Sequence, residues 1–281
     1  MAVGILTLVA TPIGNLGDFS PRAIEVLKSA DLIAAEDTRN TLKLLNHFEI
    51  RTPMTAYHEY NRFDKADELV KQLQEGKNVA CVTDAGMPGI SDPGEVLVAK
   101  CVEAGILVTA VPGPSAGITA LVISGLPTRR YRFEGFLPAD KKEREAVLQE
   151  VKEDSATLIF YEAPHRLLKT LETLLSALGD RRLAVVKELT KMHENVLRTS
   201  LSEAVRHFSE EEPRGEYVLV IEGRSFEEKK EEREQSWQHL SIEEHLRMYE
   251  SQGLDRKEAM KRAAKDRGVS RREIYDAVMK N

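Results

Sequence analysis

The segment "CVTDAGMPGISDPG" (Cys81–Gly94) is the most informative part of the sequence, because an apolar strand runs directly into a loop of turn-forming residues. Seven of the twelve residues from Thr83 to Gly94 are Gly, Pro or Asp, and none is Lys or Arg. Since parallel sheets bind ligands at the carboxyl ends of their strands, we expect this loop to hold a ligand. The carboxylate of Asp84, and close backbone approach at Gly86 and Gly89, favour a positively charged one.

Strands and helices alternate on both sides of this loop. The expected strands are Ile5–Val9, Asp31–Ala35, Val79–Thr83 and Leu107–Val111, and the expected helices are Pro21–Ala30, Thr38–Phe48, Lys65–Gln74, Pro93–Ala104 and Ser115–Ser124. Asp92 and Pro93 are expected to start one of these helices rather than to contact the ligand. The alternation predicts a parallel sheet covered by helices on both faces, in a first domain of residues 1–124.

The pattern changes after residue 124, where strands follow one another more closely. Five segments are expected to be strands: "YRFEGFL", "ATLIFYE", "RLAVVKEL", "NVLRTSL" and "EYVLVIEG". Leu183–Leu189 and Asn195–Leu201 are separated by few residues, which indicates a hairpin and therefore a mixed sheet. We expect a second α/β domain over 125–224, a charged linker over 225–240 and a helical module over 241–281.

Composition limits the class of protein. The chain has 281 residues, a net charge of -6 and a sequence pI of about 5.8, so any nucleic-acid contact requires a local basic patch. Neither a signal peptide nor an apolar run long enough for a membrane is recognised. Cys81 and Cys101 are expected to be buried free thiols. We expect a cytoplasmic protein without a bound metal.

The C-terminal module has a local excess of positive charge. Leu254–Asn281 contains nine Lys or Arg and five Asp or Glu. Lys257, Lys261 and Lys265 recur every four residues and share one helix face, and Ser270 is expected to cap a last helix that carries Arg271. These features suggest helix-turn-helix-like nucleic-acid binding, although a solvated helical cap fits the composition equally well.

One loop matches a hydrolase motif. "GPSAG" (Gly113–Gly117) fits the G-x-S-x-G pattern between a strand and a helix, so Ser115 could be a nucleophile assisted by a downstream histidine. Ser115 also occupies a natural N-cap position for the helix that follows. We favour a cap and ligand contact, because the motif does not explain the other loops. Phosphate-loop and dinucleotide-binding fingerprints are not found.

Several segments together indicate a family. They are "LVATPIGNLGD", "AAEDTRNTLKLL", "CVTDAGMPGISDPG", "VPGPSA", "FEGFLP", "YEAPHR" and "VVKELTKMHE". In this order they closely resemble the tetrapyrrole-methylase-like, class III group of S-adenosylmethionine-dependent methyltransferases, and within it the small-subunit ribosomal RNA methyltransferases. The resemblance covers residues 5 to about 223. It implies a two-domain α/β fold (a parallel-sheet and a mixed-sheet domain with a small C-terminal helical module), S-adenosylmethionine between the domains, and a homodimer.

The resemblance also implies a substrate and a cofactor pocket. The substrate would be a cytidine in the decoding region of small-subunit (16S) rRNA, as free rRNA or in the assembled subunit, methylated on its ribose 2′-oxygen. The pocket residues carried over from the motifs are Pro12, Gly14, Asp84, Ala85, Gly86, Ile90, Ser91, Ser115, Ala116, Tyr161, Leu189 and Gly215.

Charged residues at strand ends are candidates for the chemistry. A ribose hydroxyl is a poor nucleophile, so positioning and a base must assist it. The candidate catalytic residues are Glu36, Asp37, Lys187 and Glu188, and the candidate RNA-binding residues are Arg39, His58, Arg62, Lys257, Lys261, Lys265 and Arg271. Glu36 and Asp37 could instead orient cations that hold RNA phosphates, and Arg39 is the stronger candidate for such a cation.

Three other functions remain open from the sequence. A serine hydrolase would use Ser115, a tetrapyrrole methylase would share the fold, and a nucleic-acid-binding protein without catalysis would act through its C-terminal helices. The basic tail and the "EDTRNT" segment favour RNA over a small tetrapyrrole.

Overall fold

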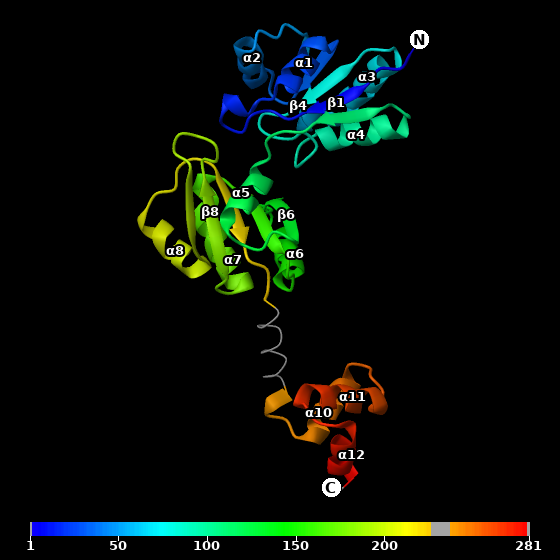
Figure 1. Ribbon diagram of the computed structural model, residues 1–281, viewed down its shortest axis with the longest axis vertical. Helices are drawn as coiled ribbons and strands as arrows, with labels where there is room; N and C mark the ends of the chain where they lie inside the picture. Colours follow the sequence, from blue (N-terminus) through cyan, green and yellow to red (C-terminus); the bar gives the residue numbers. More distant parts are fainter. Residues whose placement is uncertain (1, 226–236, 280–281) are drawn as a thin grey trace. The chain divides into compact units, whose positions relative to one another are not determined.

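The structure is a computed structural model that describes residues 2–225 and 237–279, without the side chain of the last of these (Figure 1). Met1–Gly223 and Arg224–Asn281 form two compact units. The first unit contains two five-stranded sheets, and the second is helical where it is described. None of the described helices combines the length and the apolar character that crossing a bilayer requires.

The first sheet is entirely parallel, as predicted. Its strands are β1 (Leu6–Val9), β2 (Leu32–Ala35), β3 (Met54–Ala56), β4 (Val79–Val82) and β5 (Val108–Val111), in the order β3-β2-β4-β1-β5. The sequence pattern does not predict β3, because this edge strand has only three residues and none of them is fully buried. The carboxyl ends of all five strands lie at one edge of the sheet.

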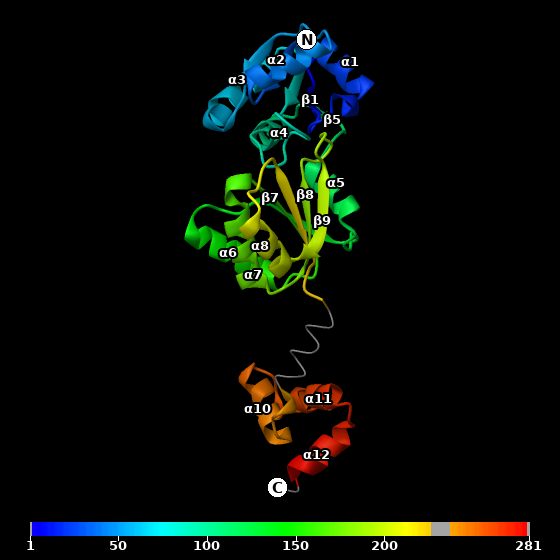
Figure 2. The same cartoon turned by 90° about the vertical axis from the view of Figure 1, so that its left-hand side faces the viewer.

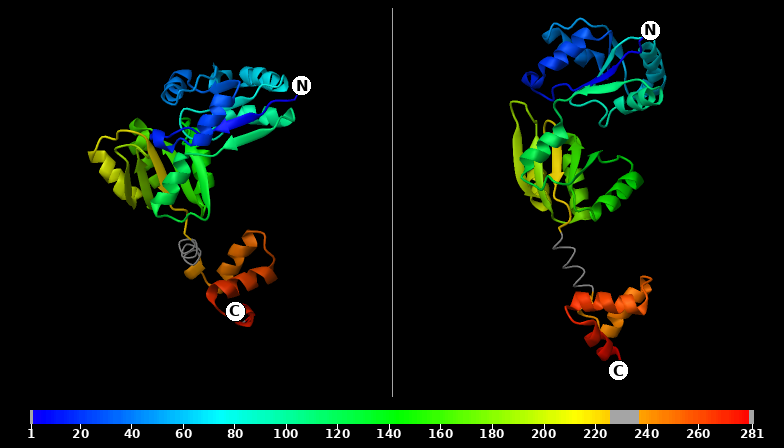
Figure 3. Two further views of the ribbon diagram at one scale, coloured as in Figure 1. Left: turned by 45° about the horizontal axis from the view of Figure 1, so that its top comes forward. Right: turned by 45° about the vertical axis from the view of Figure 1, so that its right-hand side comes forward.

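Four helices cover this sheet. They are α1 (Pro21–Ser29), α2 (Thr38–His47), α3 (Arg62–Gln74) and α4 (Gly94–Glu103), and short 3-10 turns lie at η1 (Leu16–Asp18) and η2 (Glu59–Asn61). Helices α1 and α2 lie on one face of the sheet, and α3 and α4 lie on the other (Figures 1 and 3). Apolar side chains of each pair pack against the strands. Helix α3 begins three residues earlier than expected, so Arg62 belongs to the helix.

Local signals account for several helix ends. Ser20 caps α1, with its hydroxyl accepting from the Ala23 N–H at 3.1 Å, and Pro21 occupies the first helical position. Both features were predicted. The serine hydroxyl accepts a hydrogen bond from an N–H that has no partner within the helix, and the proline has no N–H that would need one.

The second sheet is mixed, as predicted. Its strands are β6 (Tyr131–Phe136), β7 (Thr157–Glu162), β8 (Arg182–Lys187), β9 (Asn195–Ser200) and β10 (Tyr217–Ile221), in the order β6-β7-β10-β8-β9. Only β6 and β7 pair in parallel, and β8 and β9 form the expected hairpin. Helices α6 (Lys141–Lys152), α7 (Leu167–Leu178) and α8 (Leu201–Glu210) pack on one face, and the 3-10 turn η3 (Pro164–Arg166) precedes α7 (Figure 2).

Helix α5 (Ala116–Ser124) belongs to the second sheet rather than to the first domain. Its Ala120 and Leu121 are buried against residues of β7, β8 and β10, on the face opposite α6, α7 and α8 (Figure 2). The expected division at residue 124 separates α5 from the sheet on which it packs. Sequence spacing cannot reveal which sheet a helix covers, because α5 is apolar nearly all round.

The helical unit consists of α10 (Ile242–Ser251), α11 (Arg256–Arg267) and α12 (Arg271–Met279). Ser241 and Glu244 form the capping box that "SIEE" predicts. Of the expected charged linker, residues 226–236 lie outside the described residues. Trp237 is buried and stacks on His245 with ring centroids 5.1 Å apart, so the end of that segment packs with the helical unit instead.

Candidate cofactor site

Loops from three strands meet at the carboxyl edge of the first sheet. The order of strands places β1 between β4 and β5, so the loops that follow them are neighbours. Thr11 in the β1 loop and Gly86 in the β4 loop exchange two backbone hydrogen bonds, of 2.9 and 3.1 Å. The two loops therefore form a single surface.

The carboxylate of Asp92 holds the β4 loop in its curved shape. It accepts hydrogen bonds from the backbone N–H groups of Gly89, Ile90 and Gly94, the shortest at 2.7 Å. A Cβ on Gly94 would lie 2.8 Å from the Gly89 nitrogen, so only glycine fits there. Asp92 therefore shapes the loop, which goes beyond the expected role of starting a helix.

Asp84 is directed toward β2 and does not line the cavity described below. Its carboxylate accepts from the Asp37 N–H and from the Asn40 amide, both at 3.2 Å. Burial, with a smaller contribution from the nearby Glu36, raises the pKa of Asp84 above its ordinary value. This carboxylate links the β4 loop to the start of α2.

A cavity of about 380 Å³ lies between these loops and the second sheet. Its lining residues are Ile13, Ala85, Gly86, Met87, Ile90, Ser115, Ala116, Phe136, Tyr161, Glu162, Ala163, Pro164, Val186, Leu189, Glu216, Tyr217 and Val218. Its volume is in the usual range for a small-molecule site. Among the described residues that line it, none is Lys or Arg, and two are glutamates.

The amino end of α5 meets the second sheet at Tyr161. The Tyr161 hydroxyl accepts a hydrogen bond from the Gly117 N–H at 3.0 Å, and its ring packs edge-on against Phe133 and Phe136. Burial raises the pKa of Tyr161. Thus a strand residue satisfies a helix N–H group and also forms part of the cavity wall.

Ser115 occupies the N-cap position of α5, as expected, but its hydroxyl does not cap the helix. The backbone carbonyl of Ser115 accepts from Thr119, and the residue itself lines the cavity. Within the described part of the chain, Ser115 makes no hydrogen bond to a histidine. The nucleophile–base pair that a serine hydrolase needs is therefore not supported here.

The opposite wall is supported by a small ion-pair cluster. Glu188 accepts from the Glu216 N–H at 2.9 Å and from the Lys191 ammonium at 3.0 Å, and Lys191 also pairs with Glu216. Burial acts to raise the pKa of Glu188, but these contacts outweigh it and the pKa lies below its ordinary value. Gly215, at a φ of 86°, passes so close that a Cβ there would lie 2.6 Å from Glu188 Cγ.

Glu162 is a buried lining residue that the sequence reasoning did not select. Its carboxylate accepts from the Ala163 N–H and from the Thr170 hydroxyl, and it forms an ion pair of 3.3 Å with Arg166. The "YEAPHR" motif contains this glutamate, so the signal was present. Its orientation depends on α7, which no local pattern specifies.

The expected cofactor residues fall into two groups. Ala85, Gly86, Ile90, Ser115, Ala116, Tyr161 and Leu189 line the cavity, whereas Pro12, Gly14, Asp84, Ser91 and Gly215 do not. Several of the second group bring the walls together. A Cβ on Gly14 would lie 2.5 Å from Lys191 Cγ, and Ser91 Oγ would be 3.2 Å from a Cβ on Gly135.

Further lining residues come mainly from the ends of the second sheet's strands. Besides Glu162, they are Ile13, Met87, Phe136, Ala163, Pro164, Val186, Glu216, Tyr217 and Val218. Except for Glu216, these residues are apolar or aromatic, which predicts burial but not exposure to a cavity.

The four catalytic candidates lie around the cavity rather than in its lining. Glu36 accepts from the Thr83 hydroxyl at 2.5 Å and from the Asp84 N–H at 3.3 Å. Hydrogen bonds from Arg39 lower the pKa of Asp37 to about 2, so its carboxylate is a weak base. Lys187 lies at the end of β8, on the sheet face of Val185, and among the described residues it forms no ion pair.

Two of the RNA-binding candidates lie at the end of β3. Arg62 forms an ion pair with Glu59, and its guanidinium lies 4.9 Å from the centre of the Phe63 ring. His58 is half-buried, and its Nδ1 has no hydrogen-bond partner in the part of the chain that the structure describes.

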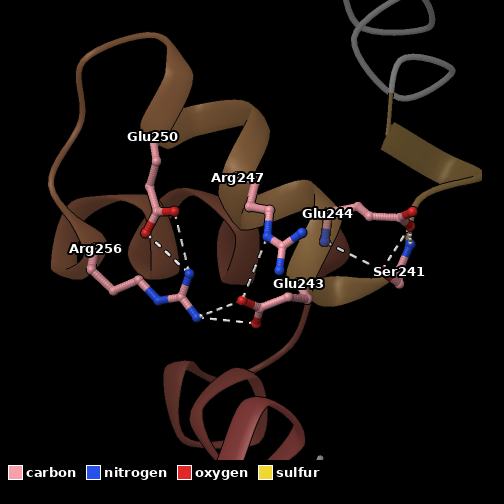
Figure 4. Close-up of polar contacts among 6 residues, drawn as sticks. All are labelled: Ser241, Glu243, Glu244, Arg247, Glu250 and Arg256. Atoms are coloured by element: carbon pink, nitrogen blue, oxygen red, sulfur yellow. Dashed lines mark hydrogen bonds and ion pairs between the residues drawn. The ribbon is translucent and has the colours of Figure 1, made fainter.

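Some basic residues of the helical unit are held by contacts within it, and others are exposed to solvent. Arg256 is held at about 3 Å by both Glu243 and Glu250 (Figure 4), and Arg267 donates to His245 and to a backbone carbonyl. These two arginines therefore stabilise the module. Lys257, Lys261, Lys265 and Arg271 are exposed, and among the described residues only Lys261 of these four forms an ion pair, with Glu258 at 3.4 Å.

Comparison with known proteins agrees with this geometry. The profile of the family Tetrapyrrole (Corrin/Porphyrin) Methylases matches residues 6–205. The chain belongs to the tetrapyrrole methylases. Solved tetrapyrrole methylases include uroporphyrin-III-C-methyltransferase from Thermus thermophilus, with a TM-score of 0.56 and 20% identity over 78% of this chain and 94% of that one. The structure of a diphthine synthase has a TM-score of 0.61 and 13% identity, and the match covers 79% of this chain and 91% of that one. These likenesses concern the fold.

Relatives of higher identity carry the name ribosomal RNA small subunit methyltransferase I. The protein of Halalkalibacterium halodurans is 50% identical over 273 residues, which cover 97% of this chain and 94% of the relative. The Bacillus subtilis protein is 48% identical, and the match covers 98% of this chain and 94% of that protein. The Thermotoga maritima protein is 45% identical over 222 residues, which are 79% of this chain but 100% of the relative. About a fifth of this chain therefore has no counterpart in the Thermotoga maritima protein.

S-adenosylmethionine is the cofactor of this tetrapyrrole methylase, and the cavity fits it. The lining combines apolar and aromatic side chains with two glutamates and no cation, which suits a positively charged sulfonium. The loop around Gly86 offers backbone groups on one side, and Tyr161 and Leu189 offer apolar surface on the other.

Proposed function

We propose that the protein transfers a methyl group from S-adenosylmethionine to the ribose 2′-hydroxyl of a cytidine in the decoding region of small-subunit rRNA. Relatives that are about 50% identical over nearly the whole chain and bear a small-subunit rRNA methyltransferase name carry this proposal. The cation-free cavity supports the cofactor, and the exposed lysines of α11 support an RNA substrate. Because the substrate is a ribosomal subunit or its RNA, we place the activity in the cytoplasm.

The chemistry depends on positioning. When bound, S-adenosylmethionine supplies a methyl group activated by its sulfonium. The loops after β1, β4 and β5 hold the cofactor, and the loops after β2 and β3 continue the same edge of the sheet and receive the ribose. Arg39, whose side chain is 86% exposed, holds a phosphate while Asp37 fixes its direction. Glu36 keeps the β4 loop in place through Thr83 and Asp84.

Lys187 is the candidate that we propose as the base. Against the effect of burial, hydrogen bonds from the Glu216 N–H and the Lys191 ammonium lower the pKa of Glu188, and hydrogen bonds from Arg39 lower the pKa of Asp37. Both carboxylates are therefore weaker bases. Lys187 remains because its side chain forms no ion pair within the described part of the chain, and we propose that it accepts the hydroxyl proton. A Lys187→Met variant should lose turnover at every pH, whereas Lys187→Arg should retain RNA affinity without turnover. Retained turnover in Lys187→Met would leave Glu36 as the candidate.

The function is tested by methyl transfer in vitro and in cells. Small subunits from a strain that lacks this protein should accept methyl groups from labelled cofactor, and nuclease digestion with mass spectrometry should yield 2′-O-methylcytidine. Methylation of a uroporphyrinogen would instead support a tetrapyrrole substrate. Labelling of Ser115 by a fluorophosphonate would support a hydrolase.

We also propose a homodimer. Ile118 and Val122 on α5 are 40% and 67% exposed, although α5 buries Ala120 and Leu121 on its other side. An apolar helix face left uncovered in the monomer suits a second copy of the chain. Sedimentation should give a dimer, and Val122→Glu should give a monomer of unchanged helical content. A wild-type monomer at micromolar concentration would rule this out.

A further inference from the structure

The turn after β3 presents an aromatic ring to solvent. Tyr60 in η2 is 96% exposed, and its ring lies edge-on to the His58 ring with the centroids 6.1 Å apart, so most of its surface faces solvent. Phe63, three residues later, is 57% exposed, and the Arg62 guanidinium lies over its ring. Exposed rings beside a cation are the combination that single-stranded RNA recognises, because bases stack on the rings while the cation attracts the backbone.

This turn is held firmly. The His58 N–H donates to Asn61 Oδ1 at 2.8 Å, and the Asn61 amide donates to the Ala56 carbonyl at 3.1 Å. The hydroxyl of the buried Tyr57 donates to the Pro93 carbonyl at 2.7 Å, which links the turn to the β4 loop. Because hydrogen bonds already fix the backbone of this turn, the turn loses little conformational entropy when a base stacks on the Tyr60 ring.

The turn also lies on the substrate side of the cofactor cavity. In the order β3-β2-β4-β1-β5, the loops after β4, β1 and β5 line the cavity. The loops after β2 and β3 come next along the same edge. Arg39 lies in the first turn of α2, directly after the β2 loop, and Tyr60 lies in η2, after β3. An RNA strand whose ribose reaches the cofactor past Arg39 therefore continues toward Tyr60.

We propose that Tyr60 is a substrate-positioning residue on which a base of single-stranded rRNA, close to the methylated nucleotide, stacks. This inference rests on the proposed function and adds the residue that recognises an unpaired strand. The shape of the site supports it, since an unstacked base can be splayed onto an exposed ring, whereas a base within a helix cannot.

The test compares full-length variants on isolated small subunits and on protein-free rRNA from a strain lacking the enzyme. Tyr60→Ala should raise KM for both RNAs by about tenfold, which is within the range expected for one base stacked on one ring. Turnover at saturating RNA and the Kd of S-adenosylmethionine should stay within about twofold of wild type. Tyr60→Phe keeps the ring and should behave as wild type.

Tyr131→Ala is the matched control. Tyr131 is 48% exposed and begins β6, at the end of the second sheet away from the cavity, so its removal should leave KM unchanged. Melting temperatures of all variants should agree, because neither ring is buried.

Three results in the Tyr60 variants would overturn the inference. An unchanged KM in Tyr60→Ala excludes stacking, and equal defects in Tyr60→Phe and Tyr60→Ala assign the effect to the hydroxyl. A defect confined to assembled subunits means that the ring contacts a ribosomal protein rather than a base. If the wild-type enzyme methylates no rRNA, the proposed function fails and the inference fails with it. If the wild type is active and only the Tyr60 effect is missing, the inference alone is wrong.

Discussion

Replacing Tyr161 by Phe should destabilise the protein without weakening cofactor binding. The Tyr161 hydroxyl accepts from the Gly117 N–H at 3.0 Å, and Gly117 is buried in the first turn of α5. Ser115 provides no side-chain cap, so the Tyr161 hydroxyl fills the role of an N-cap side chain from a distant strand. Removing the hydroxyl leaves a buried donor without its partner.

The magnitude follows from that single hydrogen bond. Loss of a cap or of a partner for a buried N–H typically costs about 1–2 kcal/mol. For a unit of this size, that corresponds to a fall in melting temperature of roughly 2–8 °C. The ring and its packing on Phe133 and Phe136 are retained, so we expect the cavity wall to keep its shape. The Kd of S-adenosylmethionine should therefore change by less than about threefold, or 0.7 kcal/mol.

The assay pairs thermal unfolding with calorimetric titration of the cofactor, and Tyr217→Phe is the control. The Tyr217 hydroxyl also accepts a backbone N–H, from Arg214 at 3.1 Å, and Tyr217 also lines the cavity. Arg214 is exposed, so water can replace that hydroxyl and the melting temperature should hardly change. Equal melting temperatures for both variants would refute the role assigned to Tyr161. A Tyr161→Phe variant of normal stability that binds cofactor tenfold more weakly would show that the hydroxyl serves the ligand.

Three further changes test other parts of the structure. Asp92→Ala removes the acceptor of three loop N–H groups and should cost roughly 2–4 kcal/mol in denaturant unfolding, with weaker cofactor binding; unchanged binding would mean that the loop keeps its shape without it. Gly215→Ala should lower the melting temperature more than Gly179→Ala, because both have positive φ but only the first Cβ meets Glu188; equal effects would contradict the clash. Deleting residues 224–281 should leave the cofactor Kd unchanged but reduce rRNA binding. If four cations of the deleted unit contact phosphates, the slope of the logarithm of the rRNA association constant against the logarithm of the salt concentration should become shallower by about 3. Undiminished methylation at low and high salt would make the tail a structural cap.

The amino-acid sequence alone determined the features that depend on neighbours along the chain. Ser20 with Pro21 starts α1, and Ser241 with Glu244 starts α10, because capping joins residues about three positions apart. The alternation of apolar runs with helical patterns predicted the parallel sheet and four of its five strands, all except β3. It also placed the loop containing Gly86 at a strand end, where the cavity lies.

Tertiary structure decided which side chains share a site. Asp84 and Glu162 are both carboxylates at strand ends, yet one links two loops of the first sheet and the other lines the cavity. Arg256 is one of the nine basic residues that give Leu254–Asn281 its excess of positive charge, but it is paired with Glu243 and Glu250 (Figure 4). Each outcome depends on the position of a segment far away in the chain. Such contacts form only when the sheets and helices pack, so no local pattern contains them.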